Sequence, residues 1–195
     1  MQLKIVKGDI VSIECDAIVS STCSDLMPSG DVDTAIHEAA GPNLTKACAK
    51  LAHCEVGACV ITEGYDLPAT YVIHTVAPNV NDYSSAHFLA QCYKNAIRSA
   101  THKGCKSIAF PLIGSGNRGF SVQKALDIAI NRLEVCAREE KKNILIYLVL
   151  KDEEITSMAV AHAKNRMEKY LVIDDEDKDM GESPMDKRWI SLCKV

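Results

Sequence analysis

Residues 144–150 form a run of seven successive apolar side chains, the feature of this 195-residue chain that most limits its fold. A strand that is apolar on both sides must be covered on both faces, which is typical of a central strand between two layers of helices. The run is far shorter than the roughly 20 residues of a membrane-spanning helix. The sequence therefore predicts a layered α/β domain and no membrane span.

Strand-like and helix-like segments alternate along most of the chain, which is typical of the α/β class. Glycine and proline at positions 41 and 42 stop one predicted helix, and Asn43 is predicted to cap the next. The predicted strands are residues 3–6, 17–20, 58–62, 71–76, 107–113 and 144–150. The predicted helices are residues 32–40, 43–51, 85–102, 121–138 and 155–171.

The charge of the chain is modest and unevenly distributed. The formal net charge is −4 and aromatic residues make up 5% of the sequence, so neither a broad basic surface nor a base-stacking platform for nucleic acid is expected. Residues 172–195 contain seven acidic and four basic residues and carry most of that net charge. We expect residues 1–171 to form the domain and residues 172–195 an acidic C-terminal extension, docked through Trp189, Ile190 and Leu192.

The nine cysteines include no CxxC pair, and the N-terminus lacks the pattern of a secretory signal. They are therefore interpreted as reduced thiols of a cytoplasmic protein, or of a nucleo-cytoplasmic one if the source is a eukaryote. A zinc site built from Cys48, His53, Cys54 and Cys59 is the alternative. The spacing of these four residues matches no common zinc motif, so neither a metal nor a cofactor is expected.

A glycine-rich loop lies between the predicted strand 107–113 and the helix that follows. Its GxGxxG pattern lets backbone N–H groups approach a diphosphate beside the positive end of a helix. The pattern comes late in the chain and lacks the acidic residue expected about 20 positions later in a nicotinamide-binding unit. A tight turn without a ligand is the alternative interpretation. The loop consists of Gly114, Ser115, Gly116, Asn117, Arg118 and Gly119.

Further short motifs occur in a fixed order around this loop, at residues 8–10, 16–19, 32–37, 39–42, 64–69, 72–76 and 107–111. Together they resemble the macrodomain family, which binds ADP-ribose and includes Appr-1''-p-processing proteins, and the chain is similar to a divergent member. The resemblance covers about residues 1–171. It implies a three-layer α/β/α sandwich around a mixed, mostly parallel sheet. It also implies that the partner is ADP-ribose or an ADP-ribosylated protein.

The resemblance implies a role for each part of the ligand-binding site. Asp9 matches the acid that accepts a hydrogen bond from the adenine amino group, and Ile10 contacts the same end through its backbone. The glycine-rich loop, with Phe120 after it, matches the segment around the diphosphate and distal ribose. The facing loop is matched by Ser29, Gly30, Asp31 and Val32.

Four residues depart from the family pattern. Cys23 replaces the asparagine that holds the distal ribose, and Asp31 replaces a glycine and either binds ribose hydroxyls or repels the ligand. Arg118 stands where an aromatic residue often flanks the distal ribose, and it is a candidate to grip a phosphate. Lys151 replaces an aromatic residue that stacks on adenine. An ion pair between Arg118 and Asp31 that closes the cleft is the alternative explanation for these two changes.

The resemblance leaves three functions open. The leading hypothesis is a module that binds ADP-ribose or a related adenine nucleotide. The second is a hydrolase of ADP-ribosyl esters or O-acyl-ADP-ribose, in which Asp33 orients the attacking water; its structural alternative is a first-turn helix residue. The third is a degenerate macrodomain that binds proteins. Cys23 as a nucleophile is disfavoured, and His37 and His74 are interpreted as packing residues.

Overall fold

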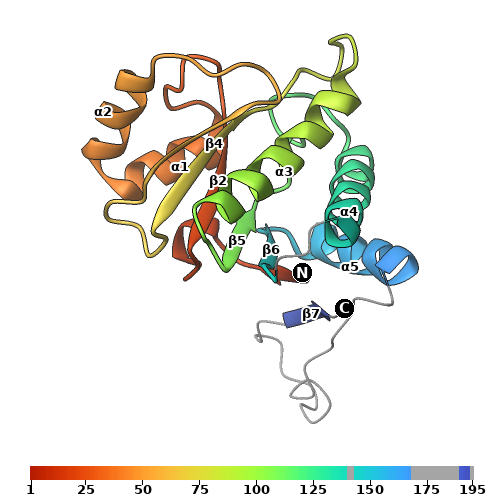
Figure 1. The fold of residues 1–195 in the computed structure, drawn as a ribbon. Coiled ribbons are helices and arrows are strands. Elements are labelled where there is room, and N and C mark those ends of the chain that lie inside the picture. Colours follow the sequence, from red (N-terminus) through yellow and green to blue (C-terminus); the bar gives the residue numbers. More distant parts are fainter. Residues whose placement is uncertain (140–142, 168–188, 194–195) are drawn as a thin grey trace.

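The computed structural model describes residues 1–139, 143–167 and 189–193 (Figure 1). Its strands are β1 (Gln2–Lys7), β2 (Ala17–Thr22), β3 (Cys59–Glu63), β4 (Tyr71–Val76), β5 (Ser107–Phe110), β6 (Leu145–Leu150) and β7 (Trp189–Cys193). Its helices are α1 (Gly30–Ala40), α2 (Pro42–Leu51), α3 (Ser85–His102), α4 (Val122–Glu139) and α5 (Glu153–Met167), with a short 3-10 helix, η1, at Ile10–Ser12. Within these residues, no helix is both long and apolar enough to cross a membrane.

The strands form one seven-stranded mixed sheet in the order β3-β4-β2-β5-β6-β1-β7. The five inner strands are parallel to one another, whereas β3 and β7 pair antiparallel at the two edges. The apolar run at residues 144–150 contains β6, which pairs with both β5 and β1. Its inner position explains why it has no polar face.

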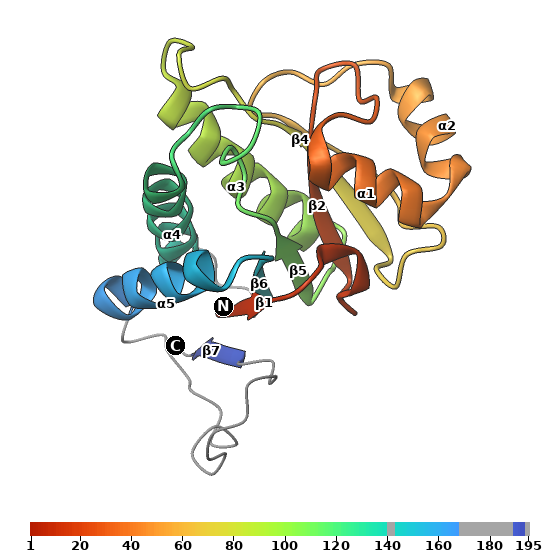
Figure 2. The same ribbon diagram turned by 180° about the vertical axis from the view of Figure 1, so that it is seen from behind.

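Helices cover both faces of the sheet (Figures 1 and 2). One face packs against α3, α4 and α5 through a core that includes Ile5, Val19 and Leu148. The other face packs against α1 and α2 through a core that includes Ile18 and Val72. The predicted three-layer α/β/α sandwich is confirmed.

Two boundary predictions are wrong for local reasons. Asn43 does not cap α2, because Pro42 occupies the first turn and the cap residue is Gly41; proline suits that position because its missing N–H is not needed there. The strand predicted to reach residue 113 ends at Phe110. Pro111 follows it, and proline has no N–H with which to continue the ladder.

The C-terminal extension is described only in part. Residues 189–193 form β7 and pair antiparallel with β1, in a register that sets Ile190 opposite Ile5. The end of the predicted last helix, residues 168–171, and the acidic stretch up to residue 188 lie outside the described residues. The docking of that acidic stretch stays a prediction.

Candidate functional site

The predicted site residues meet at one edge of the sheet, where the five parallel strands end. Asp9 comes shortly after β1, Cys23 directly after β2 and Lys151 directly after β6. The glycine-rich loop begins four residues after β5 ends. In open α/β sheets, ligands bind in the crevice outside the carboxyl ends of the strands. The strand order therefore brings together residues that are far apart in the sequence.

The glycine-rich loop presents a row of unpaired backbone donors. Among the described residues, no acceptor faces the N–H groups of Ser115, Gly116, Asn117 or Arg118. The loop is closed by a hydrogen bond from the Gly119 N–H to the Gly116 carbonyl at 3.0 Å. Successive free N–H groups in such a turn form an anion-binding concavity.

A buried tyrosine anchors the residue that precedes the glycine-rich loop. The Ile113 N–H donates to the hydroxyl of Tyr93 at 3.0 Å, and Tyr93 is fully buried on α3. Gly114 has a φ of +91°, and a Cβ there would lie 3.1 Å from the ring of Phe120. Phe120 is itself buried. It therefore supports the loop from the core side.

The first turn of α1 faces the glycine-rich loop. Gly30 starts α1 with a φ of +68°, and a Cβ there would lie 3.3 Å from Asn117 Nδ2. A helix leaves its first N–H groups without intrahelical partners, and the helix dipole favours an anion at this end. Gly30, Asp31 and Val32 supply these first-turn groups. Two sets of backbone donors thus lie on two neighbouring segments, the glycine-rich loop and the first turn of α1.

Arg118 crosses from the glycine-rich loop to the end of β2. Its Nη2 donates to the Thr22 carbonyl at 2.9 Å and to Cys23 Sγ at 3.4 Å. Asp31 is exposed, and no ion pair joins it to Arg118 among the described residues. Arg118 therefore contacts the end of β2, and the ion pair with Asp31 that was offered as an alternative is not formed.

The predicted adenine end contains an ion pair. Asp9 caps η1 by accepting from the Val11 N–H at 3.3 Å, and its other oxygen lies 3.0 Å from Lys151 Nζ. Both side chains are partly exposed. The N–H of Ile10 has no acceptor within the described part of the chain. An acceptor carboxylate and a free donor thus stand next to each other at the carboxyl ends of β1 and β6.

Asp33 is completely buried below the first turn of α1. Its carboxylate accepts hydrogen bonds from the Ser20 hydroxyl, from Thr22 Oγ1 at 2.9 Å and from the Ser29 N–H at 3.0 Å. Burial raises the pKa of this carboxyl above its ordinary value, although these hydrogen bonds act in the opposite direction. All three donors belong to β2 and the residue before α1, so the observed contacts of Asp33 fasten α1 to the sheet.

Sequence reasoning missed a buried cluster on the α1–α2 face. His37, Cys48 and His74 lie together there, and His37 Nε2 has no hydrogen-bond partner in the described structure. The zinc site considered from the sequence, with Cys48, His53, Cys54 and Cys59 as ligands, is not formed. The His53 side chain lies at the surface and pairs with Glu55. Both histidines belong to motifs of the sequence, at residues 32–37 and 72–76, and this was the signal that could have pointed to the cluster.

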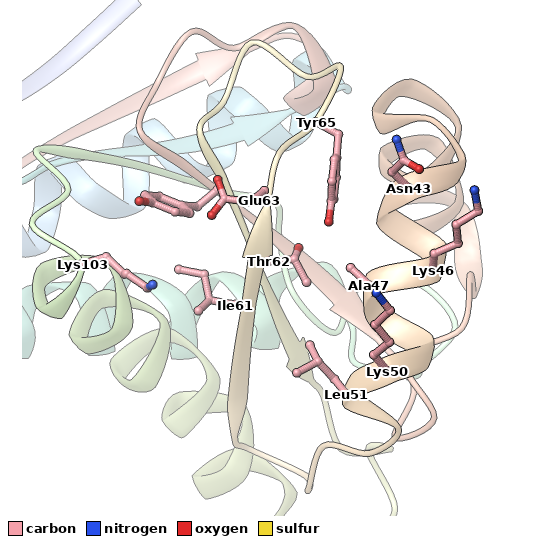
Figure 3. Close-up of a pocket in the computed structure, with 11 residues that line it drawn as sticks. Asn43, Lys46, Ala47, Lys50, Leu51, Ile61, Thr62, Glu63, Tyr65 and Lys103 are labelled. Atoms are coloured by element: carbon pink, nitrogen blue, oxygen red, sulfur yellow. The ribbon is translucent and has the colours of Figure 1, made fainter.

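Sequence reasoning also missed two surface hollows beside the edge strand β3, each of about 490 Å³. Figure 3 shows the first, with Lys46 and Lys50 on α2 on one side of β3 and Lys103 on the other. Arg98 and His102 of α3 line the second. Neither hollow is lined by a residue of the glycine-rich loop. They are separate from the site at the strand ends.

Comparisons with known proteins agree with this architecture. The family model described as Macro domain matches residues 19–129. A Macro domain-containing protein of Chlorobaculum tepidum is 42% identical over 153 residues, which cover 77% of this chain and 89% of that protein. The human ADP-ribose glycohydrolase MACROD2 is 34% identical over 183 residues, which cover 91% of this chain but only 42% of that longer protein.

Solved structures give the same result. An Oceanobacillus iheyensis macrodomain with ADP superposes with a TM-score of 0.82 at 35% identity, covering 86% of this chain and 92% of that one. A Trypanosoma brucei macrodomain in complex with ADP-ribose superposes with a TM-score of 0.76 at 29% identity, covering 83% and 68%. On the strength of its fold, its family-model match and these relatives, the chain belongs to the Macro domain family.

Proposed function

We propose that this chain binds ADP-ribose in a groove between the glycine-rich loop and the first turn of α1. The observation that carries the proposal is the set of unpaired N–H groups at residues 115–118, opposite a helix N-terminus. A diphosphate supplies the acceptors that these donors lack. The similar macrodomains from Oceanobacillus iheyensis and Trypanosoma brucei were solved with ADP and with ADP-ribose, which supports this class of ligand.

The ends of the groove suit the two ends of this ligand. Asp9 accepts from the adenine amino group, the Ile10 N–H donates to a ring nitrogen, and the Lys151 stem covers the ring. At the other end, Cys23 and Arg118 face the distal ribose. This arrangement needs no net positive charge, because the donors are backbone dipoles fixed beside the phosphates. A formal charge of −4 is therefore compatible with a dianionic ligand.

The ligand can be free or attached to a protein, so ADP-ribosylated proteins are the proposed partners. The eight cysteines between residues 15 and 136 are all free thiols. Reduced thiols are typical of the cytosol and the nucleus, which supports a cytoplasmic or nucleo-cytoplasmic location.

Titration calorimetry with ADP-ribose tests the proposal. The wild-type chain is expected to bind, and Asp9→Ala is expected to weaken binding by about 1–2 kcal/mol, because the adenine amino group loses its acceptor. Glu14→Ala is the matched control, since it removes an exposed carboxylate from the same segment. Absence of binding at millimolar ADP-ribose contradicts the proposal. Equal effects of the two substitutions contradict the adenine position.

A second candidate is hydrolysis of an ADP-ribosyl ester, because the human relative is named an ADP-ribose glycohydrolase. In this reaction water adds to the anomeric carbon of the distal ribose and the carboxylate leaves. Asp33 is the proposed orienting acid, but its oxygens are bound to β2 and Ser29. This geometry favours binding over catalysis. Release of ADP-ribose from a glutamate-modified protein tests the reaction, and loss of release in a folded Asp33→Ala variant would support the role of Asp33.

A further inference from the structure

Three potential metal ligands converge in the core between the helices and the sheet. His37 lies on α1, Cys48 on α2 and His74 on β4, and all three are buried. One ligand atom from each residue lies within 4.8 Å of the others. Cys48 Sγ is 4.0 Å from His74 Nδ1 and 3.6 Å from His74 Nε2, the nitrogen that contacts Thr62. Two ligands of one tetrahedral zinc ion stand about 3.5 Å apart, so atoms that lie within 4.8 Å of one another must approach by about 1 Å to share an ion.

Threonine hydroxyls hold one nitrogen of each imidazole. His37 Nδ1 lies 2.8 Å from Thr45 Oγ1, and His74 Nε2 lies 2.9 Å from Thr62 Oγ1. Metal-binding histidines commonly have one nitrogen fixed in this way, which orients the other toward the ion. His37 Nε2 is the other nitrogen of its ring, and it is buried without a hydrogen-bond partner among the described residues. A buried polar atom without a partner is costly.

The charge around the cluster suits a divalent cation. Binding breaks the S–H bond of Cys48 and forms a metal–sulfur bond, and the proton leaves to solvent. The cation and the thiolate together then carry one positive charge, because the two imidazoles are neutral ligands. Asp33 Oδ1 lies 3.8 Å from His37 Nε2. The buried carboxylate therefore neutralises the remaining charge.

We propose that His37, Cys48 and His74 form a buried binding site for one Zn²⁺ ion. Sulfur and imidazole nitrogen together favour zinc over Mg²⁺ or Ca²⁺, which prefer oxygen ligands. The ion joins α1 and α2 to β4 and so fixes the helix whose first turn borders the proposed ligand groove. This inference does not depend on the proposed function, because it concerns core residues that do not line that groove.

Metal content and a cobalt spectrum test this site. The full chain, unfolded and refolded with excess Zn²⁺ and dialysed, is expected to retain about one zinc per chain by elemental analysis. Refolding with Co²⁺ is expected to give a thiolate-to-cobalt charge-transfer band. Both signals should be lost in Cys48→Ser. They should persist in Cys92→Ser, because Cys92 is an equally buried thiol whose Sγ donates to the Val76 carbonyl instead.

If Cys48→Ser does not fold, a measurement on the wild-type chain alone still tests the zinc site. X-ray absorption at the zinc edge should then show one sulfur at about 2.3 Å together with imidazole nitrogens. Less than a tenth of an equivalent of zinc, with no cobalt charge-transfer band, overturns the proposal. Full metal content in a folded Cys48→Ser variant overturns it as well.

Discussion

Lys151 Nζ lies 3.0 Å from Asp9 Oδ2, so the residue that follows β6 is paired with the residue that caps η1. The same carboxylate is the proposed acceptor for the adenine amino group. Lys151 therefore competes with the ligand for Asp9, and only its aliphatic stem is left to cover the base. A half-exposed ion pair of this kind contributes little to stability. Replacement of Lys151 should therefore change the affinity for ADP-ribose much more than the free energy of unfolding.

We expect Lys151→Phe to tighten ADP-ribose binding by about 1 kcal/mol, since stacking of a base on an aromatic ring contributes about 1–3 kcal/mol. The substitution also releases Asp9 for the adenine. Titration calorimetry measures the change, and Lys50→Phe is the control because Lys50 is exposed on α2, outside the site. Unchanged or weaker binding by Lys151→Phe would show that the base does not lie over this residue.

Arg118 is expected to act at the distal end of the ligand. Its guanidinium contacts the Thr22 carbonyl and Cys23 Sγ at the end of β2. We expect Arg118→Ala to weaken ADP-ribose binding by about 1.5–3 kcal/mol, as for a lost hydrogen bond to a charged group. The same substitution should weaken the binding of AMP less, because AMP lacks the distal ribose and the second phosphate. Tighter binding of ADP-ribose by the variant would instead identify Arg118 as a residue that blocks the groove.

The reactivity of the Cys23 thiol can report on the distal end of the proposed ligand site. Cys15 is the internal control: like Cys23 it is half-buried, but burial raises the pKa of its thiol to about 12 and its Sγ donates to the Ala17 carbonyl. At pH 8 only about one in 10⁴ of such thiols is ionised, and the thiolate is the reactive form.

We therefore expect a maleimide or disulfide reagent to modify Cys23 before Cys15, as measured by peptide mass spectrometry. ADP-ribose should slow the reaction at Cys23 because the distal ribose covers it, and it should leave Cys15 unchanged. Equal rates at Cys23 with and without saturating ADP-ribose would mean that the ligand does not reach the end of β2.

Local patterns were enough to predict most of the fold. The predicted helix at residues 85–102 has the bounds found for α3. Its apolar spacing, the glycine that follows it and its length all point to the same element. The uninterrupted apolar run likewise predicted a strand inside the sheet. The predicted bounds were wrong where proline decided the outcome, at Pro42 and Pro111.

The contacts inside the site were harder to predict because they join residues distant in sequence. Arg118 and Thr22 are 96 positions apart, and no local rule sets a guanidinium against that carbonyl. The burial of Asp33 depends on two hydroxyls of β2 and on the entry of the chain into α1. The cluster at His37, Cys48 and His74 exists only because β4 packs under both α1 and α2. Sequence reasoning could name these residues but not their partners.

Asp33 and Asp31 provide a matched pair for a test of stability. Both stand in the first turn of α1, but Asp33 is fully buried with three hydrogen-bond donors, whereas Asp31 is exposed. Asp33→Ala leaves the Ser20 and Thr22 hydroxyls and the Ser29 N–H without acceptors in the core. We expect it to lower the free energy of unfolding by about 3 kcal/mol.

Asp31→Ala should change the same quantity by less than about 0.5 kcal/mol, as is usual at exposed positions. Asp33→Asn should fall between the two, because its amide oxygen still accepts from Ser29 while its NH₂ group faces a hydroxyl that can rotate to accept. Chemical denaturation, followed by circular dichroism, measures all three changes. If Asp33→Ala proves as stable as Asp31→Ala, these hydrogen bonds do not fasten α1 to β2, and an orienting role for Asp33 in catalysis becomes the better explanation of its position.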